Sequence, residues 1–145
     1  MNRASFFQRS LAWLIDQGIL SIIYLLAAIA FGLASAQYEK STIRLSGILV
    51  SLGLGVAMLI SASGHFLYFG YFWSRRERSI GMGMMNIRVT ETDGHRLSFL
   101  MAGLRGSLGY YISALIFGIG YLWFFVDQKQ ETWHDKIFDT VVLKE

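Results

Sequence analysis

The chain has 145 residues, of which 54% are apolar and 16% are charged, and its formal net charge is +3. The charged fraction is well below the roughly 25% that is typical of soluble domains, which argues against a soluble globular protein. The absence of cysteine excludes disulfides and Cys-based metal or redox sites, and the absence of proline excludes proline kinks. The length favours one domain over residues 1–145.

Two long apolar segments predict membrane-spanning helices. The first runs from Leu11 to Ala36 and has Asp16 as its only formal charge. The second runs from Leu45 to Ser74 and is flanked by Arg44 and Arg75. At about 1.5 Å per residue, each helix would be long enough to cross a hydrocarbon core of about 30 Å.

A cleaved signal peptide is the alternative for the first segment. Arg3 and Arg9 form a basic region, an apolar run follows from Gly18 to Leu33, and Ala34-Ser35-Ala36 has the pattern of a cleavage site. However, the basic region is long, Asp16 interrupts the approach to the apolar run, and the apolar run can itself span a membrane. We therefore expect the segment to be retained.

The third apolar region, from Gly106 to Val126, has the length of one span or of two short half-spans. Gly118-Ile119-Gly120 offers a break at which a helix could turn back. A re-entrant hairpin would leave the C-terminus on the cytoplasmic side, whereas a single span would place it outside. We predict the hairpin and retain the single span as the alternative.

Two β-prone stretches predict a small sheet. They are Met84 to Thr92, followed by the turn signal Asp93-Gly94, and Lys136 to Leu143. An isolated strand would leave its backbone groups unpaired, so we expect the two to pair in the cytoplasm. The predicted fold class is an all-α membrane protein. It is a small helical bundle of two full spans plus the third apolar region, with a short cytoplasmic two-stranded β element.

The basic residues flank the apolar segments, which indicates membrane orientation rather than nucleic-acid binding. Arg3 and Arg9 precede the first span, whereas Lys40 and Arg44 lie in the short first loop. Six arginines lie between the second and third segments: Arg75, Arg76, Arg78, Arg88, Arg96 and Arg105. We therefore expect a cytoplasmic N-terminus, a cytoplasmic second loop and an external first loop.

Asp16 is the most informative polar residue. A carboxylate inside an apolar span costs about 2.5 to 3.5 kcal/mol, so it should face the protein interior and have a partner. Arg9, Trp13 and Asp16 share one helix face, because they are spaced at i, i+4 and i+7. Two interpretations stay open: a structural ion pair near the interface, and a carboxylate that handles a proton or cation.

His65 is the second polar candidate within a span. In antiparallel helices Asp16 and His65 would lie at similar depths, about 9 and 12 Å from the cytoplasmic ends. The pair could form a proton relay, or His65 could be a hydrogen-bonded packing residue. At the end of the second span, Arg75, Arg76 and Arg78 could contact lipid headgroups or serve topology alone.

No motif indicates an enzyme, a metal site or a cofactor. Trp133-His134-Asp135-Lys136 lacks further ligands at zinc-site spacing. There is no G-x-S-x-G nucleophile motif, and Gly81-Met82-Gly83 lacks the rest of a nucleotide-binding motif. We expect no enzymatic activity, no metal and no cofactor.

The residues resemble the RDD family of small bacterial membrane proteins over nearly the whole chain. Met82 follows Gly81 where the family commonly has Lys, so any role of that Lys is not carried over. Arg9, Asp16 and Asp135 correspond to the Arg and the two Asp that name the family. The matching motifs are Arg9 to Asp16, Ser79-Ile80-Gly81, Ile87-Arg88-Val89, Asp93-Gly94, Arg105, His134-Asp135 and Thr140-Val141-Val142.

The resemblance implies a multi-pass protein of the bacterial cytoplasmic (inner) membrane. The expected function is that of a transporter, or a transporter component, for a cation, a proton or a small ligand. Arg9, Asp16, Arg105 and Asp135 would form its charged polar core. The alternative is a non-transporting membrane scaffold or assembly partner. The expected partners are the lipid bilayer and either further copies of the chain or another membrane protein.

Overall fold

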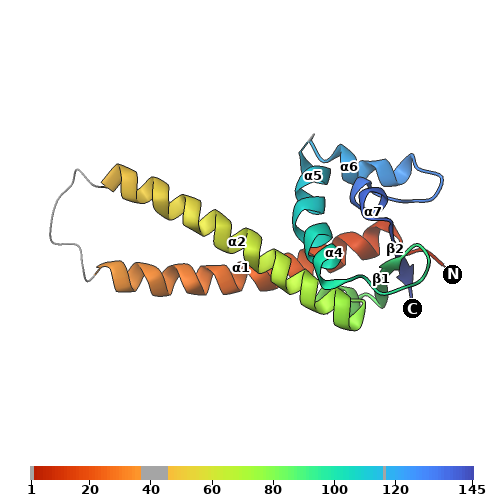
Figure 1. The fold of residues 1–145 in the computed structure, drawn as a ribbon, viewed down its shortest axis with the longest axis horizontal. Helices are drawn as coiled ribbons and strands as arrows, with labels where there is room; N and C mark the ends of the chain where they lie inside the picture. Colours follow the sequence, from red (N-terminus) through yellow and green to blue (C-terminus); the bar gives the residue numbers. More distant parts are fainter. Residues whose placement is uncertain (1, 37–45, 116) are drawn as a thin grey trace.

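The computed structural model describes residues 2–36, 46–115 and 117–145. Two long helices, α1 (Phe6–Ala36) and α2 (Ser46–Arg76), project together from a compact head that holds the remaining elements and both termini (Figure 1). Lys40 and Arg44, used above to orient the first loop, lie outside the described residues.

Both predicted apolar helices are confirmed. Phe6–Ala30 and Gly55–Arg76 are long and apolar enough to cross a membrane. The first helix begins before Leu11 because Ser5 and Gln8 form a capping box. The Gln8 amide N–H donates to Ser5 Oγ, and the Ser5 amide N–H donates to Gln8 Oε1, both at 3.2 Å.

Large apolar side chains cover the outer surfaces of both long helices. Leu25, Leu26, Leu59 and Ile60 are each more than half exposed in the isolated chain. A soluble protein rarely exposes so continuous an apolar surface, whereas lipid tails cover it at no cost. The composition and these surfaces identify a membrane protein.

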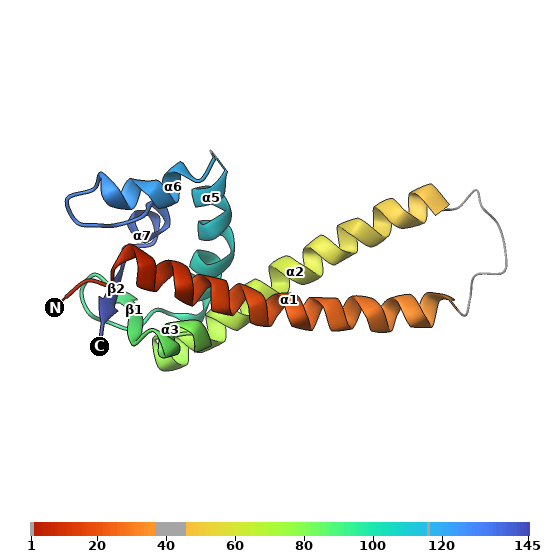
Figure 2. The same ribbon diagram turned by 180° about the vertical axis from the view of Figure 1, so that it is seen from behind.

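The head is built from short elements. After α2 come α3 (Ile80–Met84), β1 (Ile87–Glu91), α4 (Phe99–Leu104), the π-helix η1 (Arg105–Gly109), α5 (Tyr110–Ala114), α6 (Ile119–Leu122), the 3₁₀ helix η2 (Trp123–Phe125), α7 (Trp133–Ile137) and β2 (Thr140–Lys144). Seen from behind, α3 packs beneath the base of α1, and α6 and α7 lie on the side of α5 away from the projecting ends of the long helices (Figure 2).

The predicted sheet is confirmed, with shorter strands than expected. β1 and β2 pair antiparallel, in the register Ile87↔Lys144 to Glu91↔Thr140. Met84 belongs to α3 and Lys136 to α7, because each short helix has its own N-cap, Ser79 and Thr132. The Asp93-Gly94 turn is also present, with Gly94 at φ 89°.

The sheet brings the two ends of the chain together. The Ala4 amide N–H donates to the Val142 carbonyl at 3.0 Å, and Arg3 forms an isolated β-bridge with Leu143. The N-terminal segment, β1 and β2 therefore form one unit at the base of α1 and α2 (Figure 1).

The third apolar region differs from the prediction in where it begins. Its helix starts at Phe99, capped by Ser98, so Arg105 lies inside it rather than before it. The predicted break is present: Phe117 and Gly118 have φ of 49° and 76°, and the helices on either side are bent by 102°. A Cβ on Gly120 would lie 2.5 Å from Ser113 Cα, so α6 folds back tightly against α5.

The core of the head lies at the base of α2. Phe69 and Trp73 are fully buried, together with Ile87 and Val89 of β1. The π-helix approaches α2 closely, because a Cβ on Gly106 would lie only 2.3 Å from Phe69 Cβ. This close approach carries Arg105 into the interior of the head.

Candidate functional site

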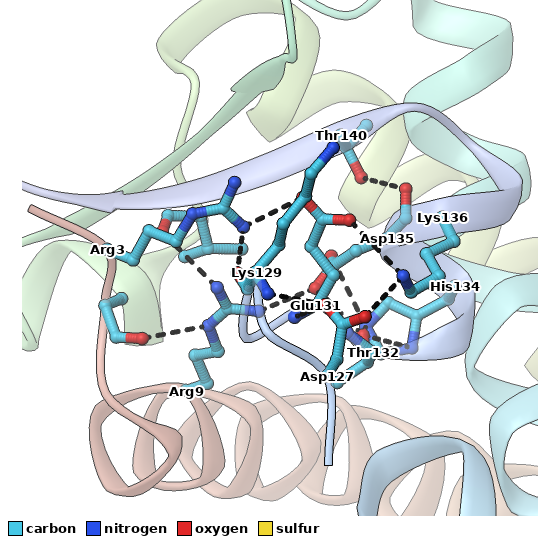
Figure 3. A network of polar contacts seen from close by, with 12 residues as sticks. Arg3, Arg9, Asp127, Lys129, Glu131, Thr132, His134, Asp135, Lys136 and Thr140 are labelled. Carbon is cyan, nitrogen blue, oxygen red and sulfur yellow. Dashed lines mark hydrogen bonds and ion pairs between the residues drawn. The ribbon is translucent and has the colours of Figure 1, made fainter. Parts of the chain in front are cut away.

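Asp135 is the centre of a buried ion-pair cluster (Figure 3). The Arg9 Nη1 donates to Asp135 Oδ2 at 2.6 Å, and the Arg105 Nη2 donates to Asp135 Oδ1. Asp135 also closes the capping box of α7, since it accepts from the Thr132 amide N–H at 3.1 Å. We call Arg9, Arg105, Thr132, Asp135 and Thr140 the Asp135 cluster.

Arg105 is held on three sides. Its Nε donates to Thr140 Oγ1 at 2.8 Å, and its guanidinium carbon lies 4.7 Å from the centre of the Trp73 ring, a cation–π distance. Within the described part of the chain, Arg105 Nη1 and Trp73 Nε1 are buried without a hydrogen-bond partner. The stacking contact therefore takes the place of a hydrogen bond at this edge of the guanidinium.

The electrostatics of the cluster keep Asp135 ionised. Burial alone would raise its pKa, but the positive charges of Arg105 and Arg9 outweigh the effect of burial and lower the pKa below the usual range. Two guanidinium groups share this one carboxylate. Loss of its charge would therefore leave both of them without a counter-ion in the interior.

His134 lies beside the cluster as a neutral imidazole. Burial is the main cause that lowers its pKa to about 3, and the positive charges of Arg105 and Arg9 lower the pKa further. The negative charge of Asp135 raises the pKa but offsets these effects only in part. Its Nδ1 lies 2.8 Å from Ser113 Oγ, and its Nε2 lies 3.0 Å from Thr132 Oγ1. The ring thus connects α5 to α7.

A second, more exposed layer surrounds the cluster. Arg3 Nη1 pairs with Glu131 Oε1 at 2.9 Å, and Lys136 Nζ pairs with Asp127 Oδ1 at 2.6 Å (Figure 3). The hydrogen bond from Lys136 lowers the pKa of Asp127. These pairs fix the loop between η2 and α7 against the N-terminal segment.

Asp16 is not part of the Asp135 cluster, so the predicted four-residue charged core is divided. Its carboxylate accepts hydrogen bonds from Tyr68 Oη at 2.7 Å, Ser79 Oγ at 2.5 Å and the Gly81 amide N–H at 2.8 Å. Among the residues that the structure describes, no cation contacts it. The structural ion pair, one of the two interpretations of Asp16, is therefore wrong, because Arg9 and Arg105 both pair with Asp135 instead.

The contact of α3 with Asp16 requires glycine at position 81. A Cβ on Gly81 would lie 2.1 Å from the Ala12 carbonyl oxygen and 3.0 Å from Asp16 Cγ. Without a side chain, the backbone of α3 can approach α1 closely enough for its amide to reach the carboxylate. This accounts for Ser79-Ile80-Gly81 as one structural unit.

His65 and Asp16 have separate partners. The His65 Nε2 lies 3.0 Å from Gln17 Oε1, and its Nδ1 lies 2.9 Å from the Ser61 carbonyl oxygen and 3.2 Å from Tyr24 Oη. The described hydrogen bonds do not join His65 to Asp16, and a proton relay between them stays a prediction. We call Asp16, Gln17, Tyr24, Ser61, His65 and Tyr68 the polar seam between α1 and α2.

The three arginines at the end of α2 differ in their surroundings. Arg75 is exposed, the Arg76 guanidinium carbon lies 5.9 Å from the centre of the Phe72 ring, and Arg78 Nη1 pairs with Glu145 Oε2 at 2.5 Å. Their contact with lipid headgroups stays a prediction.

Sequence reasoning missed several residues of these sites. Thr132 and Asp135 have the spacing of a capping box, which would have predicted α7. Ser79 was noted only as part of a motif, and nothing local marked Tyr68 or Gln17. In the described ranges, no three His, Asp or Glu side chains are grouped so that they could hold a metal ion.

The Asp135 cluster predicts a large loss of stability in Asp135→Asn. Removing one partner of a buried ion pair typically costs about 3 to 5 kcal/mol, because the remaining charge stays buried and unpaired. The measurement is thermal unfolding of the full chain in detergent, followed by circular dichroism. The matched control is Asp139→Asn, at a residue with no recorded ion pair in the described structure. Equal melting temperatures for the two variants would contradict this role of Asp135.

His134 predicts a stability that decreases with acidification. Its pKa of about 3 in the folded state lies below the 6.5 of a free imidazole, so between these values only the unfolded chain gains the proton. Stability is then complete above pH 6.5 and falls by about 2 to 3 kcal/mol by pH 4.5. Melting curves at both pH values should show a smaller difference in His134→Gln than in the wild type. Exposed His95→Gln is the control, and an unchanged slope in His134→Gln would refute the assignment.

Comparison with known proteins gives one positive result. No curated protein and no solved structure matches the chain. Residues 3–139 match the model of the RDD family. The matched range includes Arg9, Asp16 and Asp135 and covers nearly every described element. The expected resemblance is thus confirmed, and the chain belongs to the RDD family.

Proposed function

We propose that this protein is a transporter, or a component of one, that handles a proton or another small cation in the polar seam. The observation that carries the proposal is the environment of Asp16, which is 2% exposed and lies within an apolar helix. Its recorded partners are all neutral. A carboxylate held in this way inside an apolar segment is costly for the fold alone, which favours a functional reason for it.

The rest of the seam supports the proposal. Both ring nitrogens of His65 lie near oxygen atoms, at 2.9 Å from the Ser61 carbonyl oxygen and 3.0 Å from Gln17 Oε1. Gln17 follows Asp16 directly, and Tyr68 lies one helical turn after His65. The seam therefore places side chains that can carry exchangeable protons next to one another along the facing sides of α1 and α2.

A path across the membrane needs more than these two helices. Few side chains of either span are buried in the isolated chain. A cation would require additional helices to shield the seam from lipid. We therefore include further copies of the chain, or another membrane protein, in the proposed transport unit.

The proposed setting is the bacterial cytoplasmic membrane, crossed more than once, with both termini in the cytoplasm. The arginines of the N-terminal segment and of the loop after α2 favour the inside. Because the N-terminal segment pairs with β2, the C-terminus would be on the same side. The bent α5–α6 pair then acts as a re-entrant hairpin rather than as a complete span.

A membrane scaffold is the second candidate, and the surface of the third apolar region favours it. Large side chains along α5, α6, their junction and the end of η2 are exposed: Tyr111, Leu115, Phe117, Leu122, Phe125 and Val126. Another membrane protein could cover this surface without any transport. Ion flux separates the two candidates.

The proposed topology predicts the behaviour of reporter fusions. Green fluorescent protein fused after Glu145 should fluoresce, and alkaline phosphatase at the same position should be inactive, because both would stay in the cytoplasm. A phosphatase fusion after Lys40 serves as the control and should be active. Phosphatase activity after Glu145 would exclude a cytoplasmic C-terminus and the re-entrant hairpin.

The transport proposal predicts cation flux through the purified protein in liposomes. Wild-type vesicles under pH and sodium gradients should conduct more than protein-free vesicles, and Asp16→Asn should reduce the flux to the protein-free level. Asn retains an acceptor for the Gly81 amide, so the fold should survive, which gel filtration checks. Asp139→Asn, outside the seam, should conduct like the wild type. Wild-type vesicles as tight as empty ones would reject transport and favour the scaffold.

A further inference from the structure

An arginine-rich pocket opens at the end of α2, away from the polar seam and the Asp135 cluster. Its volume is about 480 Å³. It is lined by side chains from the end of α2, from β1, from the loop before α4 and from the end of the chain. These are Arg76, Glu77, Arg78, Arg88, Arg96 and Glu145. Four guanidinium groups face two side-chain carboxylates, which leaves excess positive charge.

Glu77 fixes two of the arginines. Its Oε2 lies 3.2 Å from Arg88 Nη1, and its Oε1 lies 2.5 Å from Arg96 Nε. Glu77 has φ 56°, a left-handed conformation that ends α2, and its carbonyl accepts from the Val89 amide at 2.7 Å. The backbone therefore holds this carboxylate in place, and Arg88 and Arg96 are oriented before any ligand arrives.

The other two arginines are freer. Arg78 pairs with Glu145 at 2.5 Å, a contact in which both side chains are well exposed to solvent. Arg76 rests over Phe72 and has no carboxylate partner among the described residues. Guanidinium groups in this state can present paired N–H donors to an incoming anion.

We propose that this pocket binds a phosphate group. Arginine binds phosphate oxygens through paired, charge-assisted hydrogen bonds, and several arginines around one open pocket match a multiply charged oxyanion better than a carboxylate. The ligand would contact Arg76 and displace Glu145 from Arg78. Arg88 and Arg96, which Glu77 already neutralises in part, would complete the site.

The position of the pocket points to where the phosphate comes from. The stretch Gly55–Arg76 of α2 is apolar enough to cross a membrane, and the pocket begins where this stretch ends. If α2 crosses the bilayer, this is the depth of lipid phosphates. An acidic phospholipid headgroup and a soluble phosphate share the chemistry, so the experiment must separate them. The inference does not depend on transport.

The test uses the full chain in detergent and two probes. Binding of short-chain phosphatidylglycerol, with phosphatidylcholine as the reference lipid, is counted by native mass spectrometry. Binding of radiolabelled inorganic phosphate is measured by equilibrium dialysis at constant ionic strength. Binding of phosphatidylglycerol in preference to phosphatidylcholine, without binding of inorganic phosphate, would identify a lipid headgroup site. Saturable binding of inorganic phosphate would identify a site for soluble phosphates.

Three variants make the test specific to the pocket. Arg76→Gln should weaken binding about fivefold, the effect of one basic residue on a phosphate-bearing ligand, and it breaks no ion pair. Glu145→Gln should strengthen binding, because it frees Arg78. Lys129→Gln removes one exposed positive charge that does not line the pocket and should keep wild-type affinity. Equal losses in Lys129→Gln and Arg76→Gln, no gain in Glu145→Gln, or no binding of either probe would overturn the proposal.

Discussion

The rest of the head depends on one shared carboxylate, that of Asp135. Arg9 of α1 and Arg105 of the π-helix both bind it, although Arg9 and Asp135 are 126 positions apart in the sequence. Removing ions from water costs several kcal/mol each, and the cost is offset only where the geometry is good and the remaining donors are satisfied. Thr132 donates a further hydrogen bond to the Asp135 carboxylate, and Thr140 accepts one from Arg105. The cluster thereby ties α1, the third apolar region and α7 together, and α7 leads directly into β2.

Asp16 makes a second connection of a different kind. It joins α1 to α3 and the base of α2, through neutral donors rather than through charge. Since Arg9 and Asp16 lie about two turns apart on α1, this one helix organises both sites. In the Asp135 cluster each buried charge contacts an opposite charge, so a structural role accounts for it. Asp16 contacts only neutral donors among the described residues and belongs to the polar seam, which is why the proposed function is placed there.

The protein has three surfaces with different chemistry. The polar seam lies between the two long helices, the exposed apolar side chains of α5 and α6 face outward, and the arginine pocket lies at the end of α2. We propose a different partner for each: a cation, an apolar surface of another membrane protein and a phosphate. Gly81, Gly106 and Gly120 allow close backbone contacts within the head, because a Cβ at any of them would lie 2.1 to 2.5 Å from a neighbouring atom.

The sequence by itself determined the apolar helices, the break near Gly118 and the pairing of the two β-prone stretches. Those features follow from local hydropathy, glycine and turn residues. Only the tertiary structure decided the partners of the charged residues. A structural ion pair was one of the two interpretations of Asp16, yet its partners are Tyr68, Ser79 and Gly81. Arg88 and Arg96, which the sequence related only to membrane orientation, both pair with Glu77. The reason is physical: hydropathy, helix breaks and turns depend on residues near one another in the chain, whereas a buried charge binds whichever donors the folded chain brings within hydrogen-bonding distance.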